Sequence, residues 1–486
     1  MHLPTAVLIW YALLAGQCLA ALLISQRGAL SQALTAQAAR IAIIPALWVS
    51  GLLLTQDAMS AWIVPTLIAW LGFFVVHFSL QFFSGDAQKA RALAWMQVLV
   101  VGSALTWQVS DGRGFLLALG LTLLASVRLI GLERDWPAAR AAARLAALSL
   151  GSAWLAAASV VAILAWQTSS WQIPSSAQWQ AVASPWMTHA LALAVLVAVV
   201  LSAAQWPAQR WLMSSLVAPT PVSAILHAGV VNVAAVMLWH WSHLLSASAW
   251  LGLTLGVIAV VSIILGGGMS LVQVDVKRRL AASTVAQMGC MILQCVIGAY
   301  TAALVHLVLH ACFKATHFLH ASHLKNLAPA PAFSAQAMAL NTAASLVVLA
   351  LGMALNASST VLLSSLLLTS AVLAGLRQMS WQYPLRAASY FVLPALLVAM
   401  YLAGLFEIGG GGSALVSSSQ TIALLLMLII GSALLALAQR NLASPSPQRL
   451  SMRLYAHLVA AAEAPANSID SHPSYRAQRF HLGDAQ

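Results

Sequence analysis

The segment TAALVHLVLHACFKATHFLHASHL, which runs from Thr301 to Leu324, decides the fold of this chain. It is long enough and apolar enough to cross a bilayer as one helix. It nevertheless carries six ionisable side chains, at His306, His310, Lys314, His317, His320 and His323. At about 100° per residue, all of them except His323 lie within an arc of roughly 120° and form one polar stripe.

A lysine in the middle of a membrane span has to be explained. Lys314 there costs on the order of 2.5–3.5 kcal/mol on insertion scales, so its stripe must face protein or water. A proton pathway provides such a setting. The alternative is a histidine-rich helix that packs against polar neighbours, with some side chains reaching the membrane surface. The segment alone leaves both interpretations open.

The composition is that of a polytopic membrane protein. Of 486 residues, 61% are hydrophobic and only 7% are charged, which no soluble domain of this size needs. The first apolar segment, Pro4 to Ile24, has neither the basic start nor the cleavage site of a signal peptide, so we expect a retained helix. The four cysteines lie in predicted spans without a metal-binding or disulfide spacing, and we interpret them as packing residues.

Hydropathy predicts an all-α protein with about fifteen transmembrane helices. The windows are 4–24, 40–56, 60–83, 91–109, 114–132, 146–166, 186–206, 221–245, 250–273, 283–299, 301–324, 335–355, 360–376, 386–405 and 418–438. Lysine and arginine gather in alternate connections, whereas the others hold only Arg113. The positive-inside rule therefore places the N-terminus outside and the C-terminus in the cytoplasm of a bacterial inner membrane. The net charge of +12 is mostly this topology signal, and no nucleic-acid partner is expected.

Two further segments flank the histidine-rich one. Residues 204–232, AQWPAQRWLMSSLVAPTPVSAILHAGVVN, hold three prolines and predict a discontinuous helix with His227 early in the next span; an ordinary loop is the alternative. Residues 271–289, LVQVDVKRRLAASTVAQMG, predict a tight cytoplasmic turn of architectural importance, with Ser283 or Thr284 capping the next helix. The tail from 439 predicts one amphipathic helix at 448–462, for the membrane surface or a partner.

Neither a metal site nor catalysis is predicted in this chain. His306 and His310 share a helical face that could hold zinc, but no carboxylate or cysteine of the segment completes a ligand set. The sequence has no phosphate-binding glycine loop and no haem-attachment motif, so no cofactor is expected. Other ionisable side chains in the spans are few, and among them Arg128 and His77 are possible members of an ion pathway, together with His317.

The stretches 218–228, 271–289 and 306–319 together resemble the antiporter-like proton-translocating subunits of respiratory complex I and Mrp antiporters. The resemblance implies an inverted repeat of two five-helix bundles, each with a discontinuous helix. It divides the chain into N-terminal helices (1–110), two bundles (111–245 and 246–376), C-terminal helices (377–438) and a cytoplasmic tail (439–486).

The same resemblance assigns an ion pathway. His227, His306, His310 and Lys314 match the polar axis through the membrane. The family's glutamate of the fifth helix falls at Gly120 and its lysine before the broken helix falls at Ser202. Without that pair, one half-channel of an ordinary pump is expected to be disabled.

In three respects the chain resembles the membrane subunits (DabB) of DAB-type inorganic-carbon transporters: the missing glutamate–lysine pair, the length of 486 residues and the polar tail. That branch implies a chain, embedded in membrane lipid, that conducts protons or sodium. The resemblance further implies that this ion flow drives a large peripheral DabA-like subunit, which is similar to a zinc β-carbonic anhydrase. Zinc is therefore expected in the partner subunit and not in this chain. The alternatives are a cation/proton antiporter or complex I-like subunit, and a non-conducting membrane anchor for a peripheral subunit.

Overall fold

The computed structural model describes residues 60–173, 184–246, 248–273, 275–321, 414–442 and 449–462. The predicted spans at 4–24 and 40–56, and those between 335 and 405, lie outside the described residues. The regular elements of the described part are all helices. They are α4 (Ser60–Phe82), α5 (Lys89–Gln108), α6 (Gly112–Ile130), α7 (Pro137–Thr168), α9 (Pro185–Ser202), α10 (Arg210–Ser214), the 3-10 turn η1 (Ser215–Val217), α11 (Thr220–Ala228), the 3-10 turn η2 (Val230–Asn232), α12 (Val233–Ser246), α13 (Ala249–Val272), α14 (Val276–Val296), α15 (Tyr300–Ala321), α19 (Ser418–Leu442) and α20 (Arg449–Ala462).

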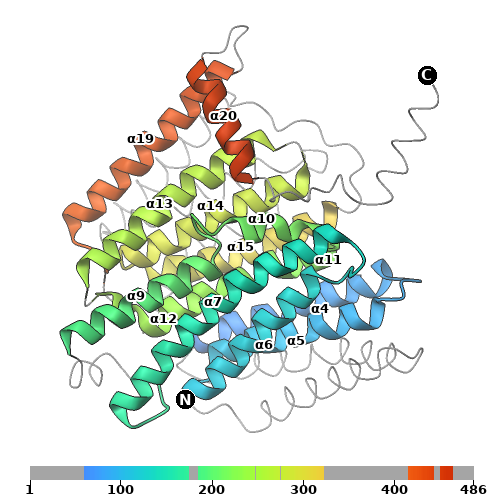
Figure 1. Ribbon diagram of the computed structural model, residues 1–486, viewed down its shortest axis with the longest axis horizontal. Helices are drawn as coiled ribbons and strands as arrows, with labels where there is room; N and C mark the ends of the chain where they lie inside the picture. The colour runs from blue at the N-terminus through green and yellow to red at the C-terminus, as the bar shows by residue number, and fades with distance from the viewer. Residues whose placement is uncertain are drawn as a thin grey trace, which may run out of the picture.

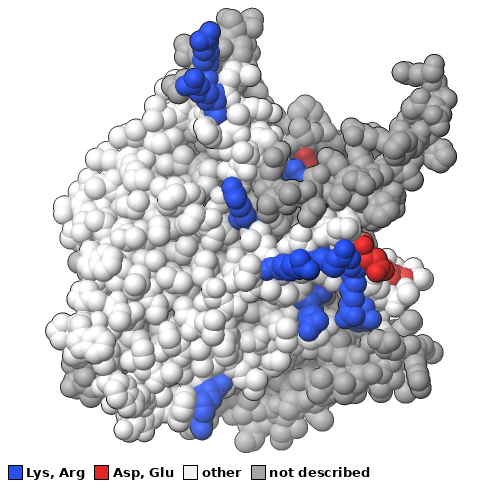
Figure 2. Space-filling model, viewed as in Figure 1, with Lys and Arg blue, Asp and Glu red and all other residues white. Residues whose placement is uncertain are grey.

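The prediction of an all-helical membrane protein is confirmed. Within the described ranges, six helices are long and apolar enough to cross a bilayer. They lie in α6, α7, α9, α13, α15 and α19. Figure 2 shows a broad face without charged side chains, with basic and acidic side chains gathered mainly near one edge. The count of about fifteen helices, the inverted repeat and the orientation in the membrane stay predictions.

Helices that follow one another in the chain pack side by side through most of the molecule (Figure 1). α4, α5, α6 and α7 form one such series, and α13, α14 and α15 form another. α9 joins them, because it packs against α7, α12 and α13. α19 and α20 lie at the rim against α13 (Figure 1). This arrangement places α15 in the interior, against α11, α14 and α4.

The chain between α9 and α12 is broken into short helical pieces, as the prolines predict. α9 ends at Ser202, before Pro207, and Pro219 separates η1 from α11. A second interruption follows at Gly229, whose φ of −120° and ψ of −61° depart from helical values. The predicted span 221–245 is therefore two helices, α11 and α12, joined by η2.

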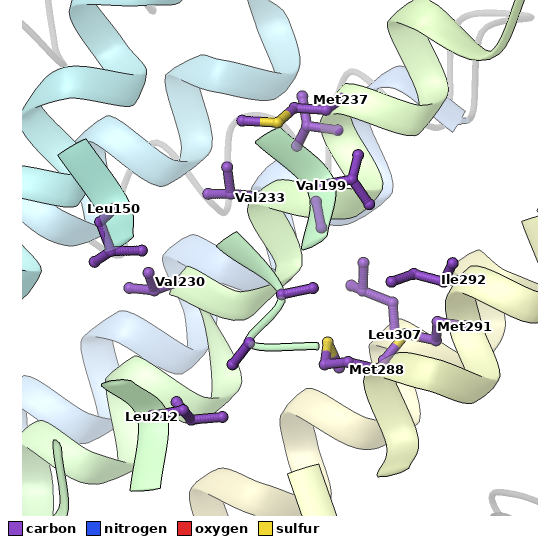
Figure 3. Packing of buried hydrophobic residues seen from close by; sticks show 14 of the residues in the cluster. Leu150, Val199, Leu212, Val230, Val233, Met237, Met288, Met291, Ile292 and Leu307 are labelled. Carbon is purple, nitrogen blue, oxygen red and sulfur yellow. The ribbon is translucent and has the colours of Figure 1, made fainter. Parts of the chain in front are cut away.

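The hydrophobic core surrounds this broken region. Figure 3 shows Met288, Met291 and Ile292 of α14 near Leu307 of α15, and Val233 and Met237 of α12 on the facing side. α13 and α14 approach closely at glycines: a Cβ on Gly266 would lie 2.6 Å from the backbone nitrogen of Ala286. Small residues allow such backbone approach between membrane helices. These close contacts fix the position of α14, which also packs against α15.

Candidate functional site: a buried polar ladder between α14 and α15

Three ionisable side chains of α15 lie in the protein interior, one helical turn apart. His306, His310 and Lys314 are 2%, 4% and 1% exposed. Their spacing of four residues corresponds to about 6 Å of helix rise per step. His227 of α11, which packs against α15, is 0% exposed. The four residues that the resemblance assigns to the polar axis are therefore all buried and come from two helices in contact.

Lys314 is held by uncharged oxygen atoms of α14. Its Nζ donates to the carbonyl of Leu280 at 2.7 Å and to the Oγ of Ser283 at 2.5 Å. The Ser283 hydroxyl in turn donates to the carbonyl of Leu280 at 2.9 Å. The acidic residues of the described part lie at helix ends or in connections, at Asp86, Asp111, Glu133, Asp135 and Asp275. The buried amine of Lys314 therefore donates to neutral hydrogen-bond acceptors and not to a carboxylate.

His306 lies between two glutamines of α14. Its Nε2 is 2.5 Å from Oε1 of Gln287, and its Nδ1 is 3.2 Å from Oε1 of Gln294. Ser283, Gln287 and Gln294 are spaced by four and seven residues, so they share one face of α14. The polar stripe of α15 therefore meets a second polar stripe on α14, and the two form a ladder of hydrogen bonds.

His310 and His227 connect α15 to α11. The His310 ring hydrogen-bonds the backbone of His227. The His227 ring stacks on Phe318 of α15, with 4.6 Å between ring centroids. Within the described ranges, both ring nitrogens of His227 and the Nε2 of His310 have no hydrogen-bond partner. Buried polar atoms are almost always bonded to protein or to water, so unpaired ring nitrogens at this place call for an explanation.

Lys277 belongs to the same neighbourhood, which the sequence alone did not reveal. Its Nζ donates to the carbonyl of Ala218 at 3.1 Å, and thus joins the first turn of α14 to the segment that precedes α11. We interpreted the turn around Lys277 as architectural, because a run of basic residues there fits a cytoplasmic loop. The predicted cap of the next helix was wrong: Asp275 caps α14 by accepting from the backbone nitrogen of Arg278 at 2.8 Å. Ser283 lies two turns inside that helix, where it binds Lys314.

The structure does not bring the other predicted pathway members into this buried group. His317 is partly exposed, and its ring lies 4.1 Å from that of Phe313. His77 on α4 and Arg128 in the last turn of α6 are exposed. Their participation in ion transfer stays a prediction.

Gly120 and Ser202, to which the resemblance assigns the family's charged pair, are both packed against neighbouring protein atoms. Gly120 lies under the indole of Trp154, whose Nε1 donates to the carbonyl of Leu116 at 2.9 Å. Ser202 is buried and its hydroxyl donates to the carbonyl of Ala198 at 2.7 Å. Neither position carries a charge.

No group of three or more His, Cys, Asp or Glu side chains gathers within the described part of the chain. The ladder consists of an amine, imidazoles, amides and a hydroxyl, which suits proton transfer and lacks the thiolate or carboxylate ligands of common zinc sites.

A family model described as NADH:quinone oxidoreductase/Mrp antiporter, transmembrane, matches residues 110–389, more than half of the sequence. The chain belongs to this family. The match contains the whole polar ladder of α14 and α15 and His227, so the ladder is built from the family's own transmembrane region.

Individual relatives indicate which members of this family the chain is similar to. The chain is 39% identical over 263 residues to a probable inorganic carbon transporter subunit DabB of Bacillus anthracis, covering 54% of this chain and 51% of that protein. It is 38% identical over 253 residues to the Bacillus subtilis counterpart, covering 52% of this chain and 50% of that protein. The chain thus spans about half the length of the curated relatives it matches. A shorter match, 44% identical over 135 residues, is to NADH-quinone oxidoreductase subunit L of Pseudomonas aeruginosa, covering 28% of this chain and 22% of that protein.

Solved structures show the same fold at low sequence identity. The Mrp complex of Dietzia sp. matches with a TM-score of 0.56 and 17% identity, covering 99% of this chain and 60% of that chain. The membrane-bound sulfane sulfur reductase, an archaeal respiratory membrane complex, matches with a TM-score of 0.56 and 15% identity, covering 96% of this chain and all of that chain. These two structures support an antiporter-like fold.

Proposed function

We propose that the chain is the ion-conducting membrane subunit of an inorganic-carbon uptake complex. In this proposal protons or sodium ions cross the membrane along His227, Lys314, His310 and His306. The observation that carries it is the ladder itself: a buried lysine on neutral acceptors, with imidazoles one and two turns away on the same helix. A buried ionisable group inside a membrane protein marks an ion route by default. The similarity to probable inorganic carbon transporter subunits DabB supports inorganic carbon as the substrate class.

The proposal assigns the carbon chemistry to a partner. A large peripheral DabA-like subunit, similar to a zinc carbonic anhydrase, would hydrate CO2 to bicarbonate in the cytoplasm. The membrane chain would bias this reaction in one direction by letting ions flow down their gradient. The zinc site would belong to that partner, and this chain would have no catalytic residue and no cofactor of its own. The inverted repeat and an inward-facing C-terminus are part of the same proposal.

The test is uptake of labelled inorganic carbon by a strain whose growth depends on this complex. We expect Lys314→Met and His310→Ala to abolish accumulation while the complex still assembles, because each removes a step of the ladder. Lys89→Met is a matched control, since Lys89 starts α5 at a partly exposed position and is not part of the ladder. Wild-type accumulation in the Lys314→Met strain would contradict the proposal.

A second candidate function is a subunit of a cation/proton antiporter or a respiratory complex. The match to NADH-quinone oxidoreductase subunit L favours it, because that segment has the highest identity among the relatives described above. Co-purification with redox or several antiporter-like subunits, instead of one large zinc protein, would select this function. A non-conducting anchor is the third possibility. It predicts that the Lys314→Met strain accumulates carbon normally, whereas truncation from 439 onward releases the partner.

A further inference from the structure

The surroundings of His306 differ from those of the other ladder residues. Two glutamines of the same helix, Gln287 and Gln294, each turn an amide oxygen toward one of its ring nitrogens. We call these two side chains the glutamine bracket. His306 and Gln294 are 2% and 0% exposed, whereas Gln287 is partly exposed, so one side of the ring faces the interior and the other faces a partly accessible amide. Two neutral amides therefore face the two nitrogens of this ring.

The bracket has two chemically distinct arrangements. A neutral imidazole has one N–H donor and one bare acceptor nitrogen, whereas a charged imidazolium has two donors. Two amide oxygens match two donors, so this orientation fits the charged ring. A neutral ring requires one glutamine to turn its amide by 180° and present its NH2 group to the bare nitrogen. The charge of His306 and the orientation of an amide are thus linked.

We infer that Gln287 and Gln294 are positioning residues that pass protons through His306 by rotation of their side-chain amides. The inference rests on the proposed ion conduction. A protonated water molecule gives its proton to the bare ring nitrogen, and the amide there turns its oxygen toward the new N–H. The opposite N–H then gives its proton to a second water molecule, as its own amide turns its NH2 group toward the nitrogen left bare. The ring ends neutral in its other tautomer, one proton has entered and one has left, and a flip of the ring restores the starting state.

The described ionisable side chains of α15 besides His306 are Tyr300, His310, Cys312, Lys314 and His317. His310 and Lys314 lie one and two turns further along, and α4, which also packs against α15, carries the exposed His77. α11 contributes His227, and α14 contributes the thiols of Cys290 and Cys295, which are buried. Within the described residues, α11, α14 and α15 contain no aspartate or glutamate. Amide oxygens are therefore the acceptors that α14 offers to a charged His306.

The chain contains a matched control for the bracket. Gln97 of α5 is also buried, at 1% exposed, but its amide has no hydrogen-bond partner within the described ranges. Gln97→Leu and Gln294→Leu make the same chemical change at two buried positions. Only the second removes a group that faces an ionisable ring.

The experiment measures proton flux and the state of the His306 ring in the full-length protein with its co-purifying subunits, reconstituted in liposomes. We expect Gln287→Leu and Gln294→Leu to lower flux about tenfold or more, the effect of one lost hydrogen bond to a charged group. Gln97→Leu should keep the wild-type flux. Nitrogen NMR of labelled histidine, with His306 identified by the signal lost in His306→Gln, should show a single fixed tautomer in the leucine variants.

A glutamate variant gives the opposite signature and covers the case in which a leucine variant does not fold. A carboxylate only accepts hydrogen bonds, so Gln287→Glu should hold His306 in its charged form, with both nitrogens protonated and flux reduced. Unchanged flux, or the same His306 nitrogen signals in the glutamine, leucine and glutamate proteins, would overturn the inference. If the wild-type protein conducts neither protons nor sodium ions, the proposed function fails, and the nitrogen signals still decide whether the bracket controls the ring. Conduction of sodium ions without protons would overturn the inference alone.

Discussion

The imidazole of His227 on α11 stacks on the ring of Phe318 on α15, with centroids 4.6 Å apart and planes 19° from parallel. No hydrogen bond to the two nitrogens of His227 fixes this ring within the described part of the chain. The stack therefore sets the position of an imidazole that lies next to His310. Aromatic pairs contribute about 0.5–1.5 kcal/mol beyond their buried area.

Phe318→Leu should reduce ion conduction because it leaves His227 free to rotate away from the ladder. We expect flux to fall several-fold, with a loss of stability of about 1–3 kcal/mol from the smaller side chain. Proton flux into liposomes and the thermal unfolding midpoint in detergent measure the two effects.

Phe115→Leu is the control for this substitution. Phe115 of α6 is equally buried and contacts the rings of His240 and Trp241, which are not part of the ladder. A similar loss of stability with unchanged flux is expected. Equal flux in both variants would show that the stack on His227 has no role in conduction.

Ser283→Ala tests the hydroxyl that accepts a hydrogen bond from Lys314. The variant leaves the buried amine with the carbonyl of Leu280 as its acceptor on α14. A hydrogen bond to a charged group is worth about 1.5–3 kcal/mol, so both stability and flux should fall. Ser283→Thr keeps the hydroxyl and should retain most of the flux.

The matched control for Ser283 is Ser126 of α6. It is equally a buried serine that donates to a carbonyl of its own helix, that of Thr122, and no hydrogen bond joins it to a cation in the described part of the chain. Ser126→Ala should change flux little. A Ser283→Ala protein that conducts like the wild type would show that the Leu280 carbonyl alone suffices for Lys314.

The sequence revealed α15 and its polar stripe because the pattern is local: charged and polar residues repeat at helical spacing inside an apolar segment. The breaks around Pro207 and Pro219 were visible for the same reason. The partners of the stripe were not, because the helical spacing of Ser283, Gln287 and Gln294 does not show which neighbouring helix their face contacts. Only the packing of α14 against α15 shows that these amides face His306.

Lys277 and His77 illustrate the two ways in which the sequence was insufficient. Lys277 belongs to a basic run that fits a loop, and its bond to Ala218 depends on how α14 meets the broken helix. His77 is a histidine in a predicted span, and only the structure shows its side chain to be exposed. Burial is a tertiary property, so composition within one helix does not determine it.

The stability of the connection before α6 should depend on pH through Asp111. This carboxylate caps α6 by accepting from the backbone nitrogens of Arg113 and Gly114, and it pairs with the Arg113 guanidinium at 3.1 Å. The side-chain hydrogen bond from Arg113 lowers the pKa of Asp111 below its ordinary 3.8. A lowered folded-state pKa means that the stabilisation is present above pH 3.8 and is lost as the pH falls through the lower value.

Asp111→Ala should therefore lower the unfolding midpoint at pH 7 and have little further effect in acid. Loss of the cap costs about 1 kcal/mol, and the exposed ion pair adds little to this. Thermal unfolding of wild type and variant between pH 7 and pH 3 measures the difference. A difference that does not shrink toward low pH would contradict the role of the ionised carboxylate.

Restoring the family's glutamate at Gly120 should destabilise the protein and should not add conduction. A Cβ at Gly120 would lie 3.0 Å from Nε1 of Trp154, whose hydrogen bond to Leu116 holds the indole in place. Gly120→Ala tests the space alone, and Gly151→Ala in α7 is the control because a Cβ there meets nothing within 4 Å. Both changes gain about 0.5–1 kcal/mol from the lower flexibility of alanine. Gly151→Ala should therefore stabilise the protein, whereas Gly120→Ala should gain less or lose stability, and Gly120→Glu should unfold at a lower temperature than either. A higher proton flux in Gly120→Glu would contradict this prediction. It would show that a carboxylate at this position takes part in conduction and that the indole of Trp154 can move aside to make room for it.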